Sequence, residues 1–557
     1  MNPRLKSGPS LAALLLVGLL TSCVGKILTP TSTGGSAGGS TSGGTGGRTG
    51  QGSGGANAGT GGGIVTGNSG GSGTGTGGQT SGAGGSAVGT GGNATPTGGT
   101  TTTGTGGGKT GGTTGTGGST GTGGATTGTC PPACGPTADQ LYDNKKLATI
   151  RITFESADTG SYTPAQWLDL LWSKWNHCPP FDASDLTRVT MQYESPDGVG
   201  NVTMKDVGMR IRGSMVRNYN QLQGFKLDFQ KLLGTATGAA RRRFGDVNRL
   251  NTLSIEKDPT HMVQCAAYQI LRDFGLPAPY CNHLKVYVNG TYYGLMENVE
   301  EPETGRFQAH HFGTTSGETY EASPSQGDCT GSAKFSDSVA KLLYSGDTFS
   351  SYTSQYKITR GSTANAEAHL IPMLKCGDAT ATASDATFKT CIAEWIDVNQ
   401  WLKQIAAESL IPTVESFMVE RNYLLYFVPD SAAPHGGRFQ LSSWDLDVSF
   451  NKATCYPSSC EPLASTASYF GPGGTRAKLA TRLTTVFRTE YCKAMRDFIS
   501  TAYKPATIDA MSAVIQSGMT NDPTTPMATW QSEVTKMRDF VTSHATSATT
   551  QINTACP

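Results

Sequence analysis

A long glycine-rich segment near the N-terminus is the feature that most constrains what this chain of 557 residues can fold into. Of its 74 glycines, 44 lie between residues 31 and 130, and this stretch has no aromatic residue and only two charges, Arg48 and Lys109. Such a composition buries too little apolar surface to offset the entropy lost on ordering. We therefore predict that residues 24–130 form a disordered Gly/Ser/Thr-rich linker, with an r.m.s. length of about 55–60 Å as a random coil.

The first 23 residues have the pattern of an export signal. Two basic residues precede an apolar run at 11–20, which is too short to span a bilayer as a permanent helix. The following "LTSC" resembles a bacterial lipobox, which would make Cys23 the lipidated first residue of the mature chain; the alternative is an ordinary cleaved secretory signal. Val24 after the cysteine favours sorting to the outer membrane. We expect a lipoprotein signal peptide over 1–23 and an anchored protein of the bacterial cell envelope, at the outer membrane or cell surface.

The remaining residues, 131–557, carry nearly all the aromatic and aliphatic side chains and are predicted to fold. They hold 38 basic and 42 acidic residues, a net charge of about −4. This part of the chain therefore lacks the excess of positive charge that is typical of nucleic-acid-binding proteins. Within them, residues 476–556 are helical by pattern, and Asn289-Gly290 is the strongest hairpin signal in the chain. A helix with a capping residue, Asp258, falls within residues 256–279.

The cysteine count agrees with export. Thirteen cysteines without Cys23 leave an even number, as expected if all pair in an oxidising compartment. Cys265 falls within a predicted helix and is equally compatible with a place in the core. No spacing matches a zinc knuckle or an HExxH motif, which argues against a zinc enzyme. Three close pairs are candidate disulfides: Cys130 with Cys134, Cys376 with Cys391, and Cys455 with Cys460.

Residues 207–231 predict a basic hairpin. Apolar residues alternate with charged ones on two runs that a polar turn separates. Guanidinium groups fit phosphate oxygens in pairs and an ammonium supplies a point charge, so the hairpin is a candidate phosphate site; the alternative is a solvated strand face. The cations in or near its turn are Arg210, Arg212, Arg217 and Lys226.

A second candidate is "FQLSSWDLDVSF", residues 439–450, where Asp445 and Asp447 stand one residue apart among strand-forming residues. Two interpretations of these aspartates are open. They could lie on the polar face of an edge strand in water, or they could form a cation site, because hard divalent ions prefer carboxylate and amide oxygens.

Five motifs in order carry a resemblance to a known family. They are "RIRG…FKLDF", "DPT…LRDFGLPAP", "VYVNGTYYGLMENVEE", "RNYLLYF" and "SSWDLDVSF", and they resemble the CotH family of spore-coat and secreted atypical protein kinases from about Leu141 to residue 451, with a weaker helical continuation. The resemblance implies an α+β, two-lobed atypical protein-kinase-like fold over residues 131–557 with a helical C-terminal part. It further implies binding of ATP with Mg²⁺ or Mn²⁺ and phosphorylation of serine or threonine in exported or cell-surface proteins.

The family's nucleotide-binding residues match three positions here. Lys226 matches the lysine of the basic strand and, with Arg212 in the preceding turn, would contact ATP phosphates. Glu300 stands six residues after Gly294, as the glutamate does in the family's G-x-Y-x-x-x-E stretch.

The family's metal ligands match the strands that follow. Asn422 matches the asparagine of the family's N-N-Y-Y-L-Y strand, and Asp445 matches the first aspartate of W-D-x-D. These two would hold the metal, with Asp447 as a second or outer ligand.

The chain departs from the family at the catalytic base, usually an aspartate. Glu415 stands there, with Glu420 nearby, so the resemblance gives the catalytic roles to Glu415 and Asp445. A glutamate is one methylene longer, and a displacement of about 1 Å can cost on the order of 100-fold in rate. Arg421 also replaces one of two tandem asparagines. These departures leave an alternative open, a catalytically weak or inactive domain that serves as a surface adhesin or structural binding module.

Overall fold

A computed structural model describes the chain over residues 133–175, 182–212, 222–234, 241–253, 258–322, 340–378, 384–413, 416–450 and 477–556. The predicted signal peptide and linker lie outside these ranges. So do the predicted lipidation site Cys23, the predicted base Glu415, and the hairpin residue Arg217.

Seven strands close into a barrel in the order β2-β3-β4-β5-β7-β9-β8. Neighbours pair antiparallel except β2 and β8, whose parallel pairing closes the barrel. The strands are β2 (Ala148–Thr153), β3 (Thr187–Glu194), β4 (Val202–Ile211), β5 (Phe225–Asp228), β7 (Arg249–Leu253), β8 (Cys281–Val288) and β9 (Thr291–Val299).

The alternation of the strands fills the barrel with apolar side chains. Met209, Leu227 and Leu250 lie in register on β4, β5 and β7 and belong to the buried barrel core. The next residue on each strand points to the opposite face, because successive side chains of a strand alternate. The predicted basic hairpin is therefore confirmed as a pair of antiparallel strands, β4 and β5.

A second sheet, in the order β11-β10-β12-β13, is antiparallel throughout. Helix α9 (Val398–Leu410) packs on it, and the Trp401 indole N–H donates to the Phe439 carbonyl of β13 across 3.0 Å. The strands are β10 (Glu318–Ala322), β11 (Tyr356–Arg360), β12 (Tyr423–Pro429) and β13 (Gly437–Ser443).

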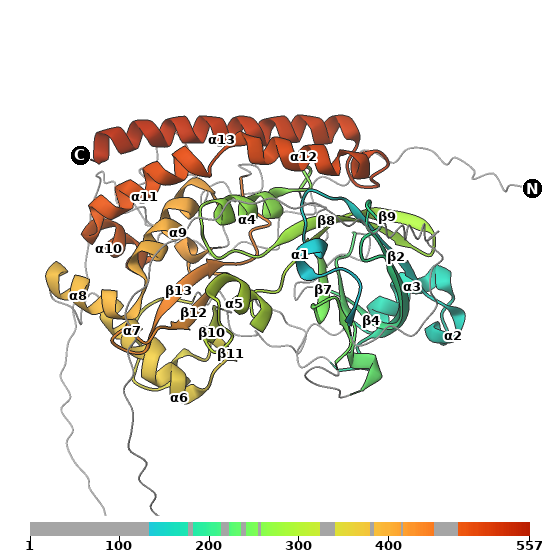
Figure 1. Ribbon diagram of the computed structural model, residues 1–557, viewed down its shortest axis with the longest axis horizontal. Coiled ribbons are helices and arrows are strands. Elements are labelled where there is room, and N and C mark those ends of the chain that lie inside the picture. Colours follow the sequence, from blue (N-terminus) through green and yellow to red (C-terminus); the bar gives the residue numbers. More distant parts are fainter. Residues whose placement is uncertain are drawn as a thin grey trace, which may run out of the picture. The chain divides into compact units, whose positions relative to one another are not determined.

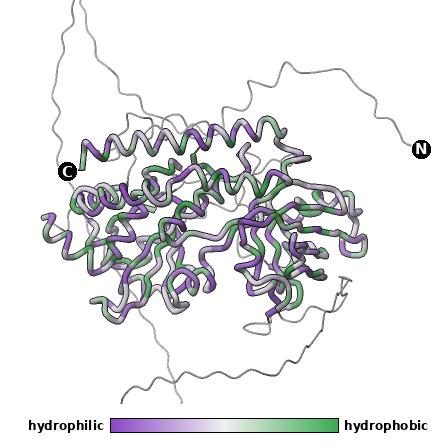
Figure 2. The backbone as a smooth tube through the Cα atoms, turned by 45° about the horizontal axis from the view of Figure 1, so that its top comes forward, coloured by the Kyte–Doolittle hydropathy of each residue, from purple (hydrophilic) through white to green (hydrophobic). Residues whose placement is uncertain are grey.

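The C-terminal residues form helices that complete the larger hydrophobic core. In Figure 1, α13 runs alongside α12 and α11, and it also contacts α9. Figure 2 shows hydrophilic and hydrophobic residues alternating along α13, and its buried residues, such as Trp530, Met537 and Val541, recur at helical spacing on one side. Among the residues that the structure describes, no helix has the length and apolar composition that a membrane crossing requires. The helices are α10 (Lys478–Val486), α11 (Arg488–Thr501), α12 (Pro505–Met519) and α13 (Met527–Ala555).

Shorter elements connect these layers. Strands β1 (Ala133–Cys134) and β6 (Arg243–Phe244) form a small parallel pair. The remaining α-helices are α1 (Ala138–Leu141), α2 (Ser156–Thr159), α3 (Trp167–Ser173), α4 (Val263–Asp273), α5 (Gly305–Phe312), α6 (Thr363–Asn365), α7 (Ile371–Gly377) and α8 (Asp385–Trp395).

The predicted two-lobed, protein-kinase-like α+β fold is wrong. The structure has instead a closed seven-stranded barrel, a separate four-stranded sheet and covering helices. Alternation within a strand and the Asn289-Gly290 turn predict local hairpins, and both residues of that turn have positive φ, 48° and 80°. Neither signal predicts that β2 pairs in parallel with β8, far along the chain, and this pairing closes the barrel.

Three disulfides join described residues: Cys265–Cys281, Cys376–Cys391 and Cys492–Cys556. The predicted Cys376–Cys391 bond is thus confirmed, and Cys265 pairs rather than packing as a free core thiol. Cys134 is also disulfide-bonded. The other cysteines of the predicted close pairs, Cys130, Cys455 and Cys460, lie outside the described residues.

Candidate functional site

The outer face of the barrel carries a cluster of cations. Arg210, Lys226 and Asn251 lie side by side on β4, β5 and β7, on the face opposite the apolar interior. This face borders a pocket of about 180 Å³. Four cations and a single carboxylate in so small a pocket suit the oxygens of an anion such as phosphate. The pocket is lined by Leu186, Arg210, Lys226, Asp228, Lys231 and Arg249.

Glu301, which follows the last barrel strand, is the carboxylate that pairs with two of these cations, Lys226 and Arg249. It forms an ion pair with Lys226, and its other oxygen lies 3.5 Å from an Arg249 nitrogen. Burial alone would raise the pKa of Glu301, but Lys226, Arg249 and Arg212 outweigh it and hold the pKa below its usual value. Glu301 is therefore ionised and fixes Lys226 at the pocket.

Glu300, the predicted cofactor residue, faces elsewhere. It forms an ion pair with Arg306 and accepts a hydrogen bond from the Tyr280 backbone N–H across 3.1 Å. Burial raises the pKa of Glu300, although Arg306 opposes this. The two consecutive glutamates thus serve different cations, and the partner of Lys226 is Glu301.

Arg212 is a cation close to the predicted W-D-L-D stretch. Its guanidinium carbon lies 5.7 Å from the centre of the Trp444 ring, within the range of a cation–π contact. Its positive charge also lowers the pKa of Glu301, the partner of Lys226, and opposes the rise in the pKa of Glu297. Arg212 therefore interacts both with Trp444, the neighbour of Asp445, and with the carboxylate that pairs with Lys226.

The predicted metal ligands Asn422 and Asp445 stand at neighbouring strand ends. Asn422 immediately precedes β12, and Asp445 comes two positions after Ser443, the last residue of β13. Both have left-handed backbone conformations, with φ of 47° and 58°. Asn and Asp tolerate this region better than other non-glycine residues, and such outliers gather at functional sites. Asp447, two residues on, is exposed.

A buried carboxylate beneath this strand end escaped sequence analysis. Glu408, on α9, accepts hydrogen bonds from the Ser443 hydroxyl, from Gln404 Nε2 at 3.0 Å and from the Met418 N–H at 3.2 Å. Burial raises the pKa of Glu408, and these donors oppose the rise. Glu408 thereby ties the end of β13 to the segment that follows Glu415.

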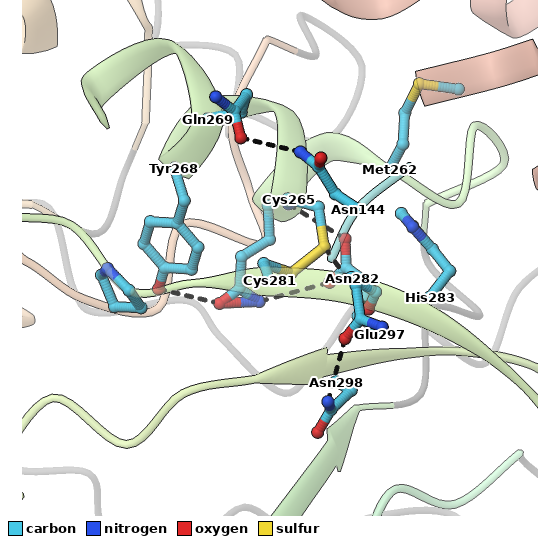
Figure 3. Close-up of a disulfide and its surroundings, with 12 residues drawn as sticks. Asn144, Met262, Cys265, Tyr268, Gln269, Cys281, Asn282, His283, Glu297 and Asn298 are labelled. Carbon is cyan, nitrogen blue, oxygen red and sulfur yellow. Dashed lines mark hydrogen bonds between the residues drawn. A yellow bond between two sulfur atoms is a disulfide. The ribbon is translucent and has the colours of Figure 1, made fainter. Parts of the chain in front are cut away.

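A cluster of potential metal ligands lies under helix α4, where Figure 3 shows it around the Cys265–Cys281 bond. Ligand atoms of Cys265, His283 and Glu297, all buried, lie within 4.8 Å of one another. The Cys265 sulfur is part of a disulfide, so it does not act as a thiolate ligand. Burial lowers the pKa of His283 to about 4, and its Nε2 lies 2.6 Å from the His261 carbonyl, to which it donates. In the oxidised protein this cluster supports α4.

The family resemblance implies two bound groups, the phosphates of ATP and a divalent cation, and the chain has side chains of the right chemistry for each. For phosphate, Arg249 Nε is a buried donor without a hydrogen-bond partner in the described part of the chain, beside the pocket it lines. For a divalent cation, Asn422, Asp445 and Asp447 offer one amide and two carboxylate side chains, the oxygen donors that Mg²⁺ and Mn²⁺ prefer.

Sequence analysis missed Arg249 because its role depends on the pairing of β5 with β7. It could not choose Glu301 over Glu297 or Glu300 as the partner of the basic hairpin, because that choice depends on the path of the chain after β9. A search of curated proteins finds no match to this chain. The family model of the CotH kinase protein matches residues 209–547, from β4 to α13, a span that starts later than the motifs suggested and includes most of the predicted helical continuation. It includes every predicted nucleotide and metal residue, and with more than half of its length matched, the chain belongs to the CotH kinase protein family.

Proposed function

We propose that this chain is an ATP-dependent protein kinase that transfers the γ-phosphate to serine or threonine of exported or cell-surface proteins, held in the bacterial envelope by a lipid on Cys23. Membership of the CotH kinase protein family supports the activity. The observation that carries the proposal is that Arg212 lies over the ring of Trp444, next to Asp445, and acts electrostatically on Glu301, which pairs with Lys226 of the cation-lined pocket.

Phosphoryl transfer asks a protein mainly for positioning and for positive charge. Lys226, Arg210 and Arg249 would bind phosphate oxygens, with Glu301 keeping the Lys226 ammonium in place. Asn422, Asp445 and Asp447 would hold Mg²⁺ or Mn²⁺, which neutralises charge that develops on the phosphate oxygens.

Two further residues were predicted to belong to the site. Glu415 lies outside the described residues, and Glu300 pairs with Arg306 instead of Lys226. Glu415 would accept the proton of the acceptor hydroxyl, a role carried over from the family resemblance alone. Glu300, bound to Arg306, would support the site without touching the nucleotide.

The test follows transfer of label from γ-labelled ATP to the protein itself and to a serine-rich acceptor, with Mg²⁺ or Mn²⁺. It uses the full-length protein with its disulfides formed. Asp445→Asn is the test variant. Asp430→Asn, an exposed aspartate beyond the far end of β12, is the matched control.

Label in the parent and in Asp430→Asn, with none in Asp445→Asn, would support the kinase. A parent that transfers nothing but gains thermal stability from ATP and metal would be a nucleotide-binding module. Without transfer or stabilisation the proposal fails, and the surface adhesin or structural binding module becomes the better description.

A further inference from the structure

We propose that Tyr268 is a positioning residue of this site, whose buried hydroxyl fixes the backbone at Asp445 and so sets where the Asp445 carboxylate meets a divalent cation. This inference rests on the proposed function. It concerns a residue on α4 that no motif of the sequence marks.

The Tyr268 hydroxyl makes two hydrogen bonds. It accepts one from the Asp445 backbone N–H across 3.0 Å. It donates its own proton to Gln264 Oε1 across 3.0 Å, one turn earlier on α4. The hydroxyl thus uses both its donor and an acceptor position. The side chain is 0 % exposed, and water therefore does not replace these bonds.

These bonds matter because the β-ladder ends just before Asp445. The last paired residues are Tyr423 and Ser443, and the next N–H, that of Trp444, still finds the Asn422 carbonyl. The N–H of Asp445, which comes next, has left the ladder, and buried backbone donors need partners. Tyr268 supplies the acceptor for this N–H.

The same bonds stabilise the unusual backbone of Asp445. A left-handed residue other than glycine persists only where its surroundings hold it. The φ of 58° at Asp445 sets the direction of its carboxylate, and Tyr268 accepts a hydrogen bond from the N–H of that residue. Without the Tyr268 hydroxyl, the Asp445 carboxylate is still present, but its orientation is no longer fixed.

Helix α4 is a rigid support for Tyr268. Asp258 Oδ2 accepts the Met262 and Val263 N–H groups, each across 2.8 Å. The prediction that Asp258 is the N-cap is wrong, because the helix begins later, at Val263 with Met262 as its N-cap, but the Asp258 carboxylate still binds the start of the helix. The Cys265–Cys281 disulfide ties the helix to β8, directly beside Tyr268 in Figure 3. The hydroxyl therefore acts from a fixed position.

The test variant is Tyr268→Phe, which removes one oxygen atom and keeps the ring. Tyr352→Phe is the matched control: Tyr352 is also 0 % exposed, and its hydroxyl accepts the Ser345 N–H at 2.7 Å and donates to the Gly346 carbonyl at 2.9 Å. Two measurements are made on the full-length oxidised protein. One is hydrogen exchange of the Asp445 amide without nucleotide or metal. The other is the dependence of phosphate transfer on Mn²⁺ and, separately, on ATP.

In Tyr268→Phe we expect faster exchange at the Asp445 amide and a rise of about tenfold in the apparent KM for Mn²⁺, the order expected when a buried hydrogen bond to a backbone group is lost. The KM for ATP at saturating Mn²⁺ stays unchanged, a split that general destabilisation would not give. Tyr352→Phe changes neither quantity.

Unchanged exchange, or an unchanged KM for Mn²⁺ in an active Tyr268→Phe protein, would overturn the inference and leave the proposed function standing. A parent without metal-dependent transfer would remove the proposed function, and with it the role of Tyr268 in presenting a metal ligand, whatever the exchange rates show.

Discussion

The backbone N–H of Trp444 donates to the backbone carbonyl of Asn422 across 2.8 Å. This bond is the last rung between β12 and β13, and on either side of it a non-glycine residue, Asn422 or Asp445, adopts a left-handed conformation. Two strand ends that turn in this way carry both predicted metal ligands to one place. The metal-binding role and the backbone conformation can be separated by substitution.

The Asn422→Gly substitution removes the amide side chain and keeps the left-handed backbone conformation. Glycine adopts φ near 47° without a steric penalty, so we expect the free energy of unfolding to change by less than about 1 kcal/mol. The amide oxygen is lost, and metal-dependent transfer should fall by at least about 100-fold, as expected for loss of a metal ligand or of its close support. Thermal unfolding with and without Mg²⁺ and ATP measures both.

Asn422→Ala is the control for conformation. It removes the same ligand but forces Cβ into the left-handed region, which costs roughly 1–2 kcal/mol. An Asn422→Gly protein that keeps full metal-dependent transfer would show that Asn422 is no ligand.

Local patterns predicted the parts of this site that lie along single segments. The alternation around Arg210 and Lys226 predicted strands, and the register places these two side chains opposite each other. Cys376–Cys391 as a close disulfide also follows from neighbours in sequence. Each of these features needs only a few residues to specify it.

What sequence could not predict depends on contacts between distant segments. The choice between Glu300 and Glu301 as partner of Lys226 turns on the side to which each points after β9. Tyr268 reads as one more apolar residue of a buried helix, because its partner Asp445 is 177 positions away.

The partner of Lys226 can be tested directly. Glu301→Gln leaves Lys226 and Arg249 without their buried carboxylate, and breaking a buried ion pair costs on the order of 3–5 kcal/mol. We expect lower stability at pH 7 and a KM for ATP raised about tenfold as Lys226 loses its position. Glu300→Gln, the matched control, should lose stability through Arg306 and keep the KM for ATP. The reverse pattern would return the nucleotide role to Glu300.

Acid should reduce the stabilisation by Glu301. Its cations hold its pKa below the value of an unfolded glutamate, near 4.5, so the stabilisation is complete above that pH and is lost as the pH falls through the folded pKa. The difference in unfolding free energy between parent and Glu301→Gln should therefore be constant from pH 7 to about pH 5 and narrow below pH 4.5. A difference that grows on acidification would contradict this sign. Urea unfolding at each pH measures it.

His283 should make the protein sensitive to acid in a higher range. Burial lowers its pKa from about 6.5 to about 4, so the folded state resists protonation that the unfolded state accepts. The corresponding stability is complete above pH 6.5 and is lost as the pH falls from 6.5 to 4, with a slope of up to about 1.4 kcal/mol per pH unit.

His261 and His311 also have lowered pKa values and add to the same slope, whereas buried Glu297 and Glu300, with raised pKa values, act in the opposite direction. The comparison is therefore between parent and His283→Gln, which keeps a donor for the His261 carbonyl. The variant should lose less stability between pH 6.5 and 4. Equal slopes would show that His283 does not titrate in this way.

The disulfide under α4 should affect the site, whereas a disulfide of the C-terminal helices should affect stability alone. Replacing Cys265 and Cys281 by alanine opens a loop with a sequence separation of 16, for which chain entropy predicts a loss of about 3 kcal/mol. Replacing Cys492 and Cys556 opens a separation of 64 and should cost more, about 4 kcal/mol. Stability alone would thus predict the greater loss of function in the second variant.

We expect the opposite order for the effect on the apparent KM for Mn²⁺. Cys265 stands one turn before Tyr268 on α4, and its N–H also donates to Glu297 Oε1 across 3.1 Å, so loosening the helix moves the hydroxyl that holds Asp445. The apparent KM for Mn²⁺, measured well below both melting temperatures, should rise several-fold in the Cys265/Cys281 variant and stay at the parent value in the Cys492/Cys556 variant. If both variants, or neither, shift the apparent KM for Mn²⁺, the disulfide beside Tyr268 has no specific link to Asp445. It then contributes to global stability only.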